Sequence, residues 1–132
     1  MDVQTGIKGE KKFTVAEGQL ASSVGSGLVN VLATPSMIAA VENTAAMSVQ
    51  PELEEGKTTV GVSISVSHVA ATPQGMEVRI ETELTGIAPN GRVMTFRVAC
   101  YDEAGLIGEG THQRAIVDRA RFEAKAQAKL GR

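Results

Sequence analysis

Glu42 is the only charged residue between Glu17 and Glu52, and it falls in the middle of a predicted helix. On a helical wheel it lies at the rim of an apolar stripe, close to Ile38 and Val49. A carboxylate without a partner is costly in apolar surroundings and usually acquires a counter-charge or a shifted pKa. Two interpretations stay open. Glu42 is either a rim glutamate that reaches water, or a base or nucleophile held in an apolar cleft.

His68 is the second candidate, because no other ionisable side chain lies between Lys57 and Glu77. It continues an alternating apolar run over Val60–Val66, and this parity predicts that its ring faces the core. It is either a core histidine with satisfied hydrogen bonds, or an acid–base group that meets a carboxylate on the packing helix. His112, by contrast, is expected at an edge or on a solvent-facing side.

Thr34 is the third candidate. It precedes Pro35, and this pair predicts a helix start with Thr34 as N-cap and Pro35 as the first helical residue. The free N–H groups of such a helix end are also suited to a developing oxyanion. Thr34 and Glu42 are eight residues apart, which is roughly 12 Å along a helix axis. The two side chains are therefore expected to flank one cleft rather than to touch.

Hydrophobic periodicity predicts the elements that position these residues. A strand is expected over 11–17, a helix over 36–49 that Pro51 ends, and a terminal helix from Asp118 to a C-cap at Gly131. Residues 18–30 are rich in Gly and Ser and are interpreted as a linker or as a mobile lid. Four strands of period two are expected over 60–66, 78–84, 94–100 and 106–117, with turns at 71–75, 89–91 and 103–105.

Tight turns between consecutive strands predict an antiparallel sheet. In the first of the four strands the expected core-facing residues are Val60, Val62, Ile64 and Val66. One apolar helix must bury its stripe on this sheet, which gives an α+β architecture. The length of 132 residues predicts one domain over 1–132.

Composition excludes several classes of function. The net charge of −2 and the 3% of aromatic residues disfavour nucleic-acid binding. Cys100 is the single cysteine, and no Cys/His cluster predicts a metal site. Neither a membrane span nor a signal peptide is expected, which favours a cytoplasmic location. The basic C-terminal stretch from Arg114 is interpreted as a solvated helix face or as a region that attracts a polyphosphate ligand.

Three stretches, taken in order, resemble the acyl-CoA thioesterases of the fluoroacetyl-CoA thioesterase type. They are VLATPSMIAAVENTA at 31–45, VSHVAATP at 66–73 and GEGTHQR at 108–114. The resemblance implies a hotdog fold, an antiparallel sheet wrapped around one long central helix. It also implies a homodimer or dimer of dimers with the site near the subunit interface, an acyl-CoA substrate, and no metal or separate cofactor.

The resemblance assigns catalytic roles to Thr34, Glu42 and His68, and it places Gly61 near the thioester carbonyl and Arg114 near the site. Glu42 would act as nucleophile or as general base on water, two roles that the sequence leaves open. Thr34 would hydrogen-bond the reacting groups, His68 would supply acid or electrostatic help, and the Gly61 N–H would polarise the carbonyl.

Two other functions stay open at this point: hydration or dehydration of an acyl thioester, and acyl-CoA binding without catalysis. The fluoroacetyl-specific enzyme has phenylalanines ahead of its helix, whereas residues 18–33 contain no aromatic residue. A wide pocket mouth without strong preference for a fluoroacetyl group is therefore expected.

Overall fold

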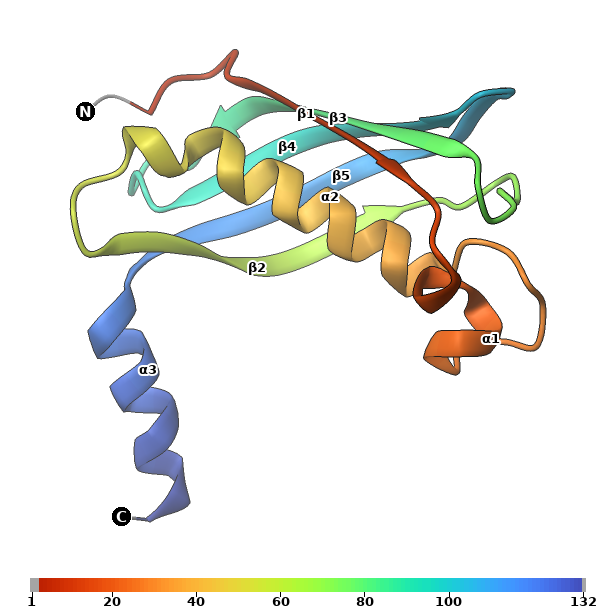
Figure 1. Cartoon of the computed structure of the whole chain (residues 1–132). Helices are drawn as coiled ribbons and strands as arrows, with labels where there is room; N and C mark the ends of the chain where they lie inside the picture. Colours follow the sequence, from red (N-terminus) through yellow and green to blue (C-terminus); the bar gives the residue numbers. More distant parts are fainter. Residues whose placement is uncertain (1–2, 132) are drawn as a thin grey trace.

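The computed structural model describes residues 3–131, in which five antiparallel strands form one curled sheet (Figure 1). The strands are β1 (Lys8–Thr14), β2 (Lys57–Val66), β3 (Glu77–Ile87), β4 (Val93–Asp102) and β5 (Gly105–Asp118). Their order across the sheet is β1-β3-β4-β5-β2. Each predicted strand is present, although β1 begins and ends about three residues earlier than the pattern over 11–17 indicates.

Helix α2 (Thr34–Val49) lies across one face of this sheet, and the strands curl around it (Figure 1). Its sixteen residues include no charged side chain except Glu42, so almost every face of the helix can approach apolar neighbours. The side chains that it buries are Met37, Ala40, Val41, Thr44, Ala45 and Val49. A short 3₁₀ turn, η2 (Gln50–Glu52), ends it at Pro51, as predicted. The α+β architecture is confirmed.

The core lies between α2 and the inner face of the sheet. Two apolar clusters fill it, one around Met37, Val41, Ile80 and Cys100, the other around Ala45 and Phe96. Period-two alternation holds along β3 and β4, whose alternate side chains are fully buried. Burial also raises the pKa of the Cys100 thiol to about 11, so this cysteine packs as a neutral, unreactive thiol.

The turn predicted at 71–75 is present, with the Met76 N–H bonded to the Pro73 carbonyl and Gly75 at φ 92°, but it does not join β2 to β3 as a hairpin. β2 pairs with β5 at one edge of the sheet, whereas β3 pairs with β1 and β4. Residues 67–76 therefore carry the chain from the β2 edge past β5 and β4 to β3. This crossing places His68 in irregular backbone beyond the end of β2.

The predicted inward series of β2 is wrong for half of its members, because the strand contains a bulge. Thr59 and Gly61 face α2, and the register then shifts between Gly61 and Ser63. Val62 is the extra residue and is 55% exposed. A bulge inserts one residue and so reverses the parity of everything that follows it. Beyond it Ile64 pairs with His112 and faces the helix side of the sheet as predicted, but at the sheet edge it is 37% exposed instead of buried in the core.

The Gly- and Ser-rich segment that precedes α2 is an ordered flap rather than a featureless loop. It contains a 3₁₀ turn, η1 (Glu17–Gln19), and one helical turn, α1 (Ala21–Val24). Buried Leu20 and Leu32 anchor its two ends and pair through a β-bridge. Its tip is open to solvent, with Leu28 97% exposed.

The chain ends in α3 (Arg119–Gln127) and a 3₁₀ turn, η3 (Ala128–Leu130). The predicted caps are confirmed: the Asp118 carboxylate accepts a hydrogen bond from the Arg121 N–H, and Gly131 is left-handed with φ 76°. α3 buries none of its residues and extends away from the sheet past the β2 edge (Figure 1). Within residues 3–131 no helix is long and apolar enough to cross a membrane.

Candidate active site

Thr34 and His68 form the first half of the site. Thr34 is the first residue of α2, and His68 lies in the segment that follows β2. The Thr34 Oγ1 and the His68 Nδ1 are 2.7 Å apart and share a hydrogen bond. The direction of this bond depends on the histidine tautomer, since a hydroxyl can both donate and accept.

The predicted capping role of Thr34 is wrong. Ala33 occupies the N-cap position, without a side-chain cap, and Thr34 is already helical. Pro35 is therefore the second helical residue rather than the first. The Thr34 hydroxyl is free of the helix end, and it orients the imidazole of His68 instead.

The second ring nitrogen of His68 is available for chemistry. Its Nε2 atom is buried, and no described residue hydrogen-bonds to it. Burial also lowers the pKa of His68 below its ordinary value, so the neutral ring is favoured near pH 7. A neutral imidazole oriented through Nδ1 can donate or accept a proton at Nε2, according to its tautomer.

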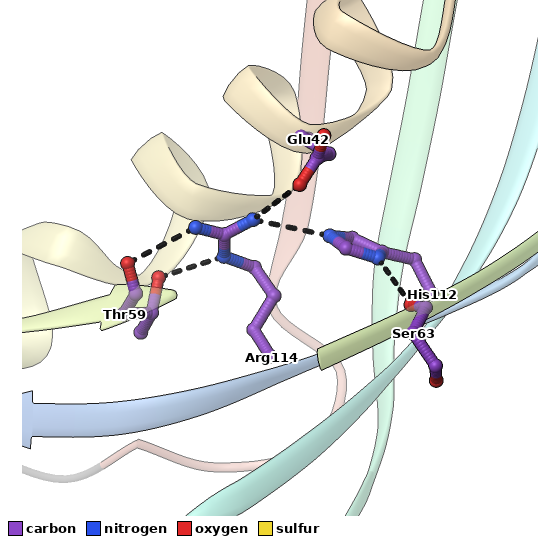
Figure 2. A network of polar contacts seen from close by, with 5 residues as sticks. All are labelled: Glu42, Thr59, Ser63, His112 and Arg114. Atoms are coloured by element: carbon purple, nitrogen blue, oxygen red, sulfur yellow. Dashed lines mark hydrogen bonds and ion pairs between the residues drawn. The ribbon is translucent and has the colours of Figure 1, made fainter. Parts of the chain in front are cut away.

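Glu42 forms the second half of the site, together with Arg114. Glu42 lies two turns along α2 from Thr34, and Arg114 lies on β5 opposite the helix (Figure 2). The Glu42 Oε2 and the Arg114 Nη1 are 3.6 Å apart and form an ion pair. The Glu42 side chain is 43% exposed, whereas that of Arg114 is 8% exposed. The carboxylate thus faces open space with a buried cation behind it.

Buried Arg114 is held by a fixed set of neighbours. Its Nε donates to the Thr59 hydroxyl at 2.8 Å, and its Nη2 donates to the Thr59 carbonyl at 3.0 Å. Its Nη1 lies 3.1 Å from the His112 Nε2 (Figure 2). A guanidinium loses its hydration when it is buried, and these contacts replace the hydrogen bonds to water that Arg114 gives up.

His112 is a residue whose place the sequence reasoning missed. It was expected at an edge or in solvent, but only 1% of it is exposed. Because β5 is an inner strand between β4 and β2, its alternate side chains, His112 and Arg114, both point toward α2. The alternation of residues 108–114 is compatible with a strand that buries His112 and Arg114 on one face. The glycines and polar residues around them made this pattern hard to recognise.

Gly61 lies directly beneath the Glu42 carboxylate. A Cβ at this position would come within 2.5 Å of the Glu42 Oε2, closer than real Cβ atoms approach another atom. The bulge in β2 begins at the same residue. Glycine is therefore required here for the carboxylate to lie against the strand.

The two halves of the site are neighbours along α2 but do not touch. No hydrogen bond or ion pair joins Glu42 to His68 within residues 3–131, so the expected direct pair between them is not formed. A cleft of about 300 Å³ borders Thr34 and His68. Small side chains line most of it: Ala21, Val29, Val31, Ala33, Val69, Ala70 and Ala71. A larger hollow of about 640 Å³ lies over charged residues of the outer face, remote from this chemistry. Among the residues described, no group of three or more His, Cys, Asp or Glu could hold a metal ion.

Comparisons with known proteins identify the family and the fold of the chain. Residues 15–120 match the family described as fluoroacetyl-CoA-specific thioesterase, FlK. The chain belongs to this family. A fluoroacetyl-CoA thioesterase of Streptantibioticus cattleyicolor is 37% identical over 99 residues, which cover 75% of this chain and 70% of that protein.

Solved structures are similar over nearly the whole chain. The structure of the fluoroacetyl-CoA thioesterase FlK matches with a TM-score of 0.91 and 30% identity, covering 98% of both chains. A thioesterase superfamily member of Thermus thermophilus matches with a TM-score of 0.88 and 26% identity, covering 98% of this chain and 95% of that one. The fold is therefore the hotdog fold, and the chain is an acyl-CoA thioesterase, a thioester hydrolase.

The buried histidines predict how stability depends on pH. Burial lowers the pKa of both His68 and His112. The Arg114 cation lowers the pKa of His112 further, while the Ser63 carbonyl and Glu42 raise it in part. Each ring thus binds a proton more weakly in the folded chain than in the unfolded one. The free energy of unfolding should hold steady above about pH 6.5 and fall as the pH drops through the folded pKa values.

Urea unfolding between about pH 8 and about pH 5 measures this effect. His112→Gln should flatten the decline, because glutamine does not titrate, and His68→Gln should remove the other component. An undiminished decline in both variants would contradict the assignment.

Proposed function

We propose that Glu42 is the group that reacts with the acyl thioester or activates water toward it. One observation carries this proposal: a half-exposed carboxylate lies over a glycine, with a buried guanidinium 3.6 Å behind it. The cation attracts the carboxylate and orients it. Because Gly61 has no side chain, the carboxylate can lie against the backbone of β2, where the Gly61 N–H is also found.

Two balanced routes use this arrangement. As a nucleophile, a Glu42 oxygen would bond to the thioester carbon and expel the CoA thiolate, and water would then hydrolyse the acyl-enzyme anhydride. As a general base, Glu42 would take a proton from water while the hydroxide adds to the carbonyl carbon and the thiolate leaves. Neither route requires a metal or an organic cofactor, since CoA arrives as part of the substrate.

His68 and Thr34 are proposed to act at the other side of the thioester. Thr34 fixes the imidazole through Nδ1, which leaves Nε2, bonded to none of residues 3–131, for the carbonyl oxygen or the departing sulfur. A donor at Nε2 would stabilise the negative charge that develops on either atom. The Gly61 N–H is proposed as a further donor to the carbonyl, and Arg114 as the charge that positions Glu42.

The cleft beside Thr34 and His68 suggests the acyl groups that the enzyme accepts. Its lining consists largely of alanine and valine, and no aromatic residue of the flap narrows it. We infer that it takes aliphatic acyl groups larger than acetyl. The Streptantibioticus relative is a fluoroacetyl-CoA thioesterase, but the flap of this chain offers nothing that would single out fluorine.

A homodimer through β2 is proposed as the working form. β2 is an edge strand whose residues 58–66 carry neither charge nor proline, and Val62 and Ile64 are exposed on it. The opposite edge, β1, carries Lys8, Glu10, Lys11 and Lys12. Charged edge strands resist pairing with another chain, whereas uncharged ones favour it.

A cytoplasmic location is also proposed, because the single buried cysteine fits a reducing compartment.

Glu42→Gln tests the catalytic proposal. The substitution keeps the shape of the side chain and removes its charge, so thioesterase kcat should fall by ~10²-fold or more. Thiol release from a panel of acyl-CoA esters measures this. Glu55→Gln, at an exposed glutamate outside the site, is the matched control and should stay at the wild-type rate.

Gly61→Ala provides an independent arm of the same test. The new methyl group displaces only the flexible end of Glu42, so activity should fall while the melting temperature changes little. Gly86→Ala, whose new Cβ meets nothing closer than 3.8 Å, serves as the control. A folded Glu42→Gln enzyme with wild-type turnover would remove Glu42 from the mechanism.

The acyl pocket predicts selectivity. Fluoroacetyl-CoA and acetyl-CoA should differ little in kcat/KM, and short branched or linear aliphatic esters should be better substrates than either. Val29→Phe adds an aromatic ring at an exposed lining position and should reduce activity on the larger esters while sparing acetyl-CoA. A large advantage for fluoroacetyl-CoA in the wild type would overturn the inference.

The β2 edge predicts the oligomeric state. Sedimentation should give at least twice the 13.8 kDa mass of the chain. Val62→Lys places a charge on the pairing edge and should yield monomers. Met47→Lys, at an equally exposed apolar side chain on α2, should leave the assembly intact. An unchanged assembly in Val62→Lys would exclude pairing through this edge.

A further inference from the structure

Beneath Glu42 lies a pair of buried polar side chains, Arg114 and His112, of which the second has no part in the proposed chemistry. They stand two residues apart on β5, with 7% and 1% of their surface exposed. Neither reaches the open side of the site. Buried polar groups of this kind are costly unless each finds a partner, so their contacts report what holds them.

The contacts of His112 allow one tautomer only. Its Nδ1 lies 2.8 Å from the Ser63 carbonyl oxygen, which can only accept, so Nδ1 carries the hydrogen. Its Nε2 lies 3.1 Å from the Arg114 Nη1, which can only donate, so Nε2 carries the lone pair. The neutral ring therefore links β2 to the guanidinium, as Figure 2 shows.

Three contacts are needed to fix the plane of the Arg114 guanidinium. Two of them, from Nε and Nη2, go to Thr59 and define one edge of the group. The plane could still tilt about that edge. The third contact, from Nη1 to His112, removes this freedom. Nη1 is also the atom that forms the ion pair with Glu42.

We propose that His112 is a positioning residue of the thioesterase: by accepting a hydrogen bond from Arg114, it holds the guanidinium under Glu42 and so fixes the reactive carboxylate. This inference rests on the proposed role of Glu42. Arg114 supplies the one ion pair or hydrogen bond that the Glu42 side chain makes within the described part of the chain. A shift of its Nη1 therefore passes directly to the carboxylate.

The groups that face His112 are consistent with this role. On its own strand the neighbour is the Arg114 cation; α2 contributes the Glu42 carboxylate, β2 the Ser63 carbonyl, and β4 the Phe96 ring at 6.3 Å between centroids. Only the first of these would oppose a second proton on the imidazole at close range. If the His112 Nε2 were protonated, its N–H would also face the Arg114 Nη1, which is itself a donor, and the hydrogen bond between them would be lost.

Two substitutions at 112 separate positioning from packing. His112→Phe keeps a ring of similar shape without an acceptor, and a mispositioned carboxylate should lower kcat by ~10- to 100-fold with KM nearly unchanged. In His112→Gln the amide oxygen can take the place of Nε2 toward Arg114, so most of the kcat should return. Ile80→Val, in the core and away from the network, controls for lost stability alone. Rates are compared per folded enzyme.

A double-mutant cycle distinguishes positioning from a merely structural role. If the role of His112 were only structural, the effects of the His112 and Arg114 substitutions on kcat would be additive. If His112 acts through Arg114, then His112→Phe should slow an Arg114→Met enzyme no further. Should the phenylalanine variant fail to fold, His112→Asn replaces it, because its shorter amide can reach Ser63 but not Arg114. Wild-type kcat in the Phe or Asn variant, or full additivity in the cycle, would overturn the proposal. The Glu42→Gln variant tests the catalytic role of Glu42 separately. If it is inactive while His112→Phe has wild-type kcat, the positioning role of His112 is refuted and the role of Glu42 stands.

Discussion

The burial of one guanidinium governs how this site is built. Arg114 is inside the sheet-and-helix sandwich, where an unpaired charge would be severely destabilising. Thr59, on the neighbouring edge strand, therefore supplies both its hydroxyl and its carbonyl, and His112 supplies a ring nitrogen. The carboxylate that balances the charge comes from α2. The helix and the two strands at this end of the sheet are thus tied together by one cation.

The same cation explains two local irregularities of β2. Glu42 can approach Arg114 only by passing over the strand, and the absence of a Cβ at Gly61 leaves that path open. The bulge that begins at Gly61 turns Val62 outward, so the strand leaves the carboxylate half exposed instead of sealing it into the core. A side chain at 61 would displace the carboxylate from this position. The Glu42 carboxylate thus stays accessible to solvent and still compensates the charge of Arg114.

Much of this could be predicted from the sequence, and the failures have definite causes. Period-two alternation identified β3 and β4, and Glu42 stood out as the lone charge on an apolar helix. Local patterns could not reveal that β2 pairs with β5 rather than β3, because strand partners are chosen by the whole sheet. The bulge reversed the parity on which the placement of Val62 depended. His112 was missed because glycines and polar residues flank it, whereas its burial follows from the inner position of β5 in the sheet.

Thr34 illustrates the limit of local rules in another way. A threonine before proline satisfies the sequence requirements of an N-cap, yet its hydroxyl bonds to a histidine 34 residues away. Because Ala33 caps the helix with backbone alone, the hydroxyl is released for a longer-range contact. The site therefore consists of two separately oriented groups, Thr34–His68 and Glu42–Arg114–His112, and α2 contributes one residue to each of them. α2 fixes the spacing between them, so the gap of roughly 12 Å along its axis is a property of the scaffold. Because Glu42 is carried by this helix and His68 is hydrogen-bonded to it through Thr34, the helix itself sets how far the carboxylate lies from the imidazole.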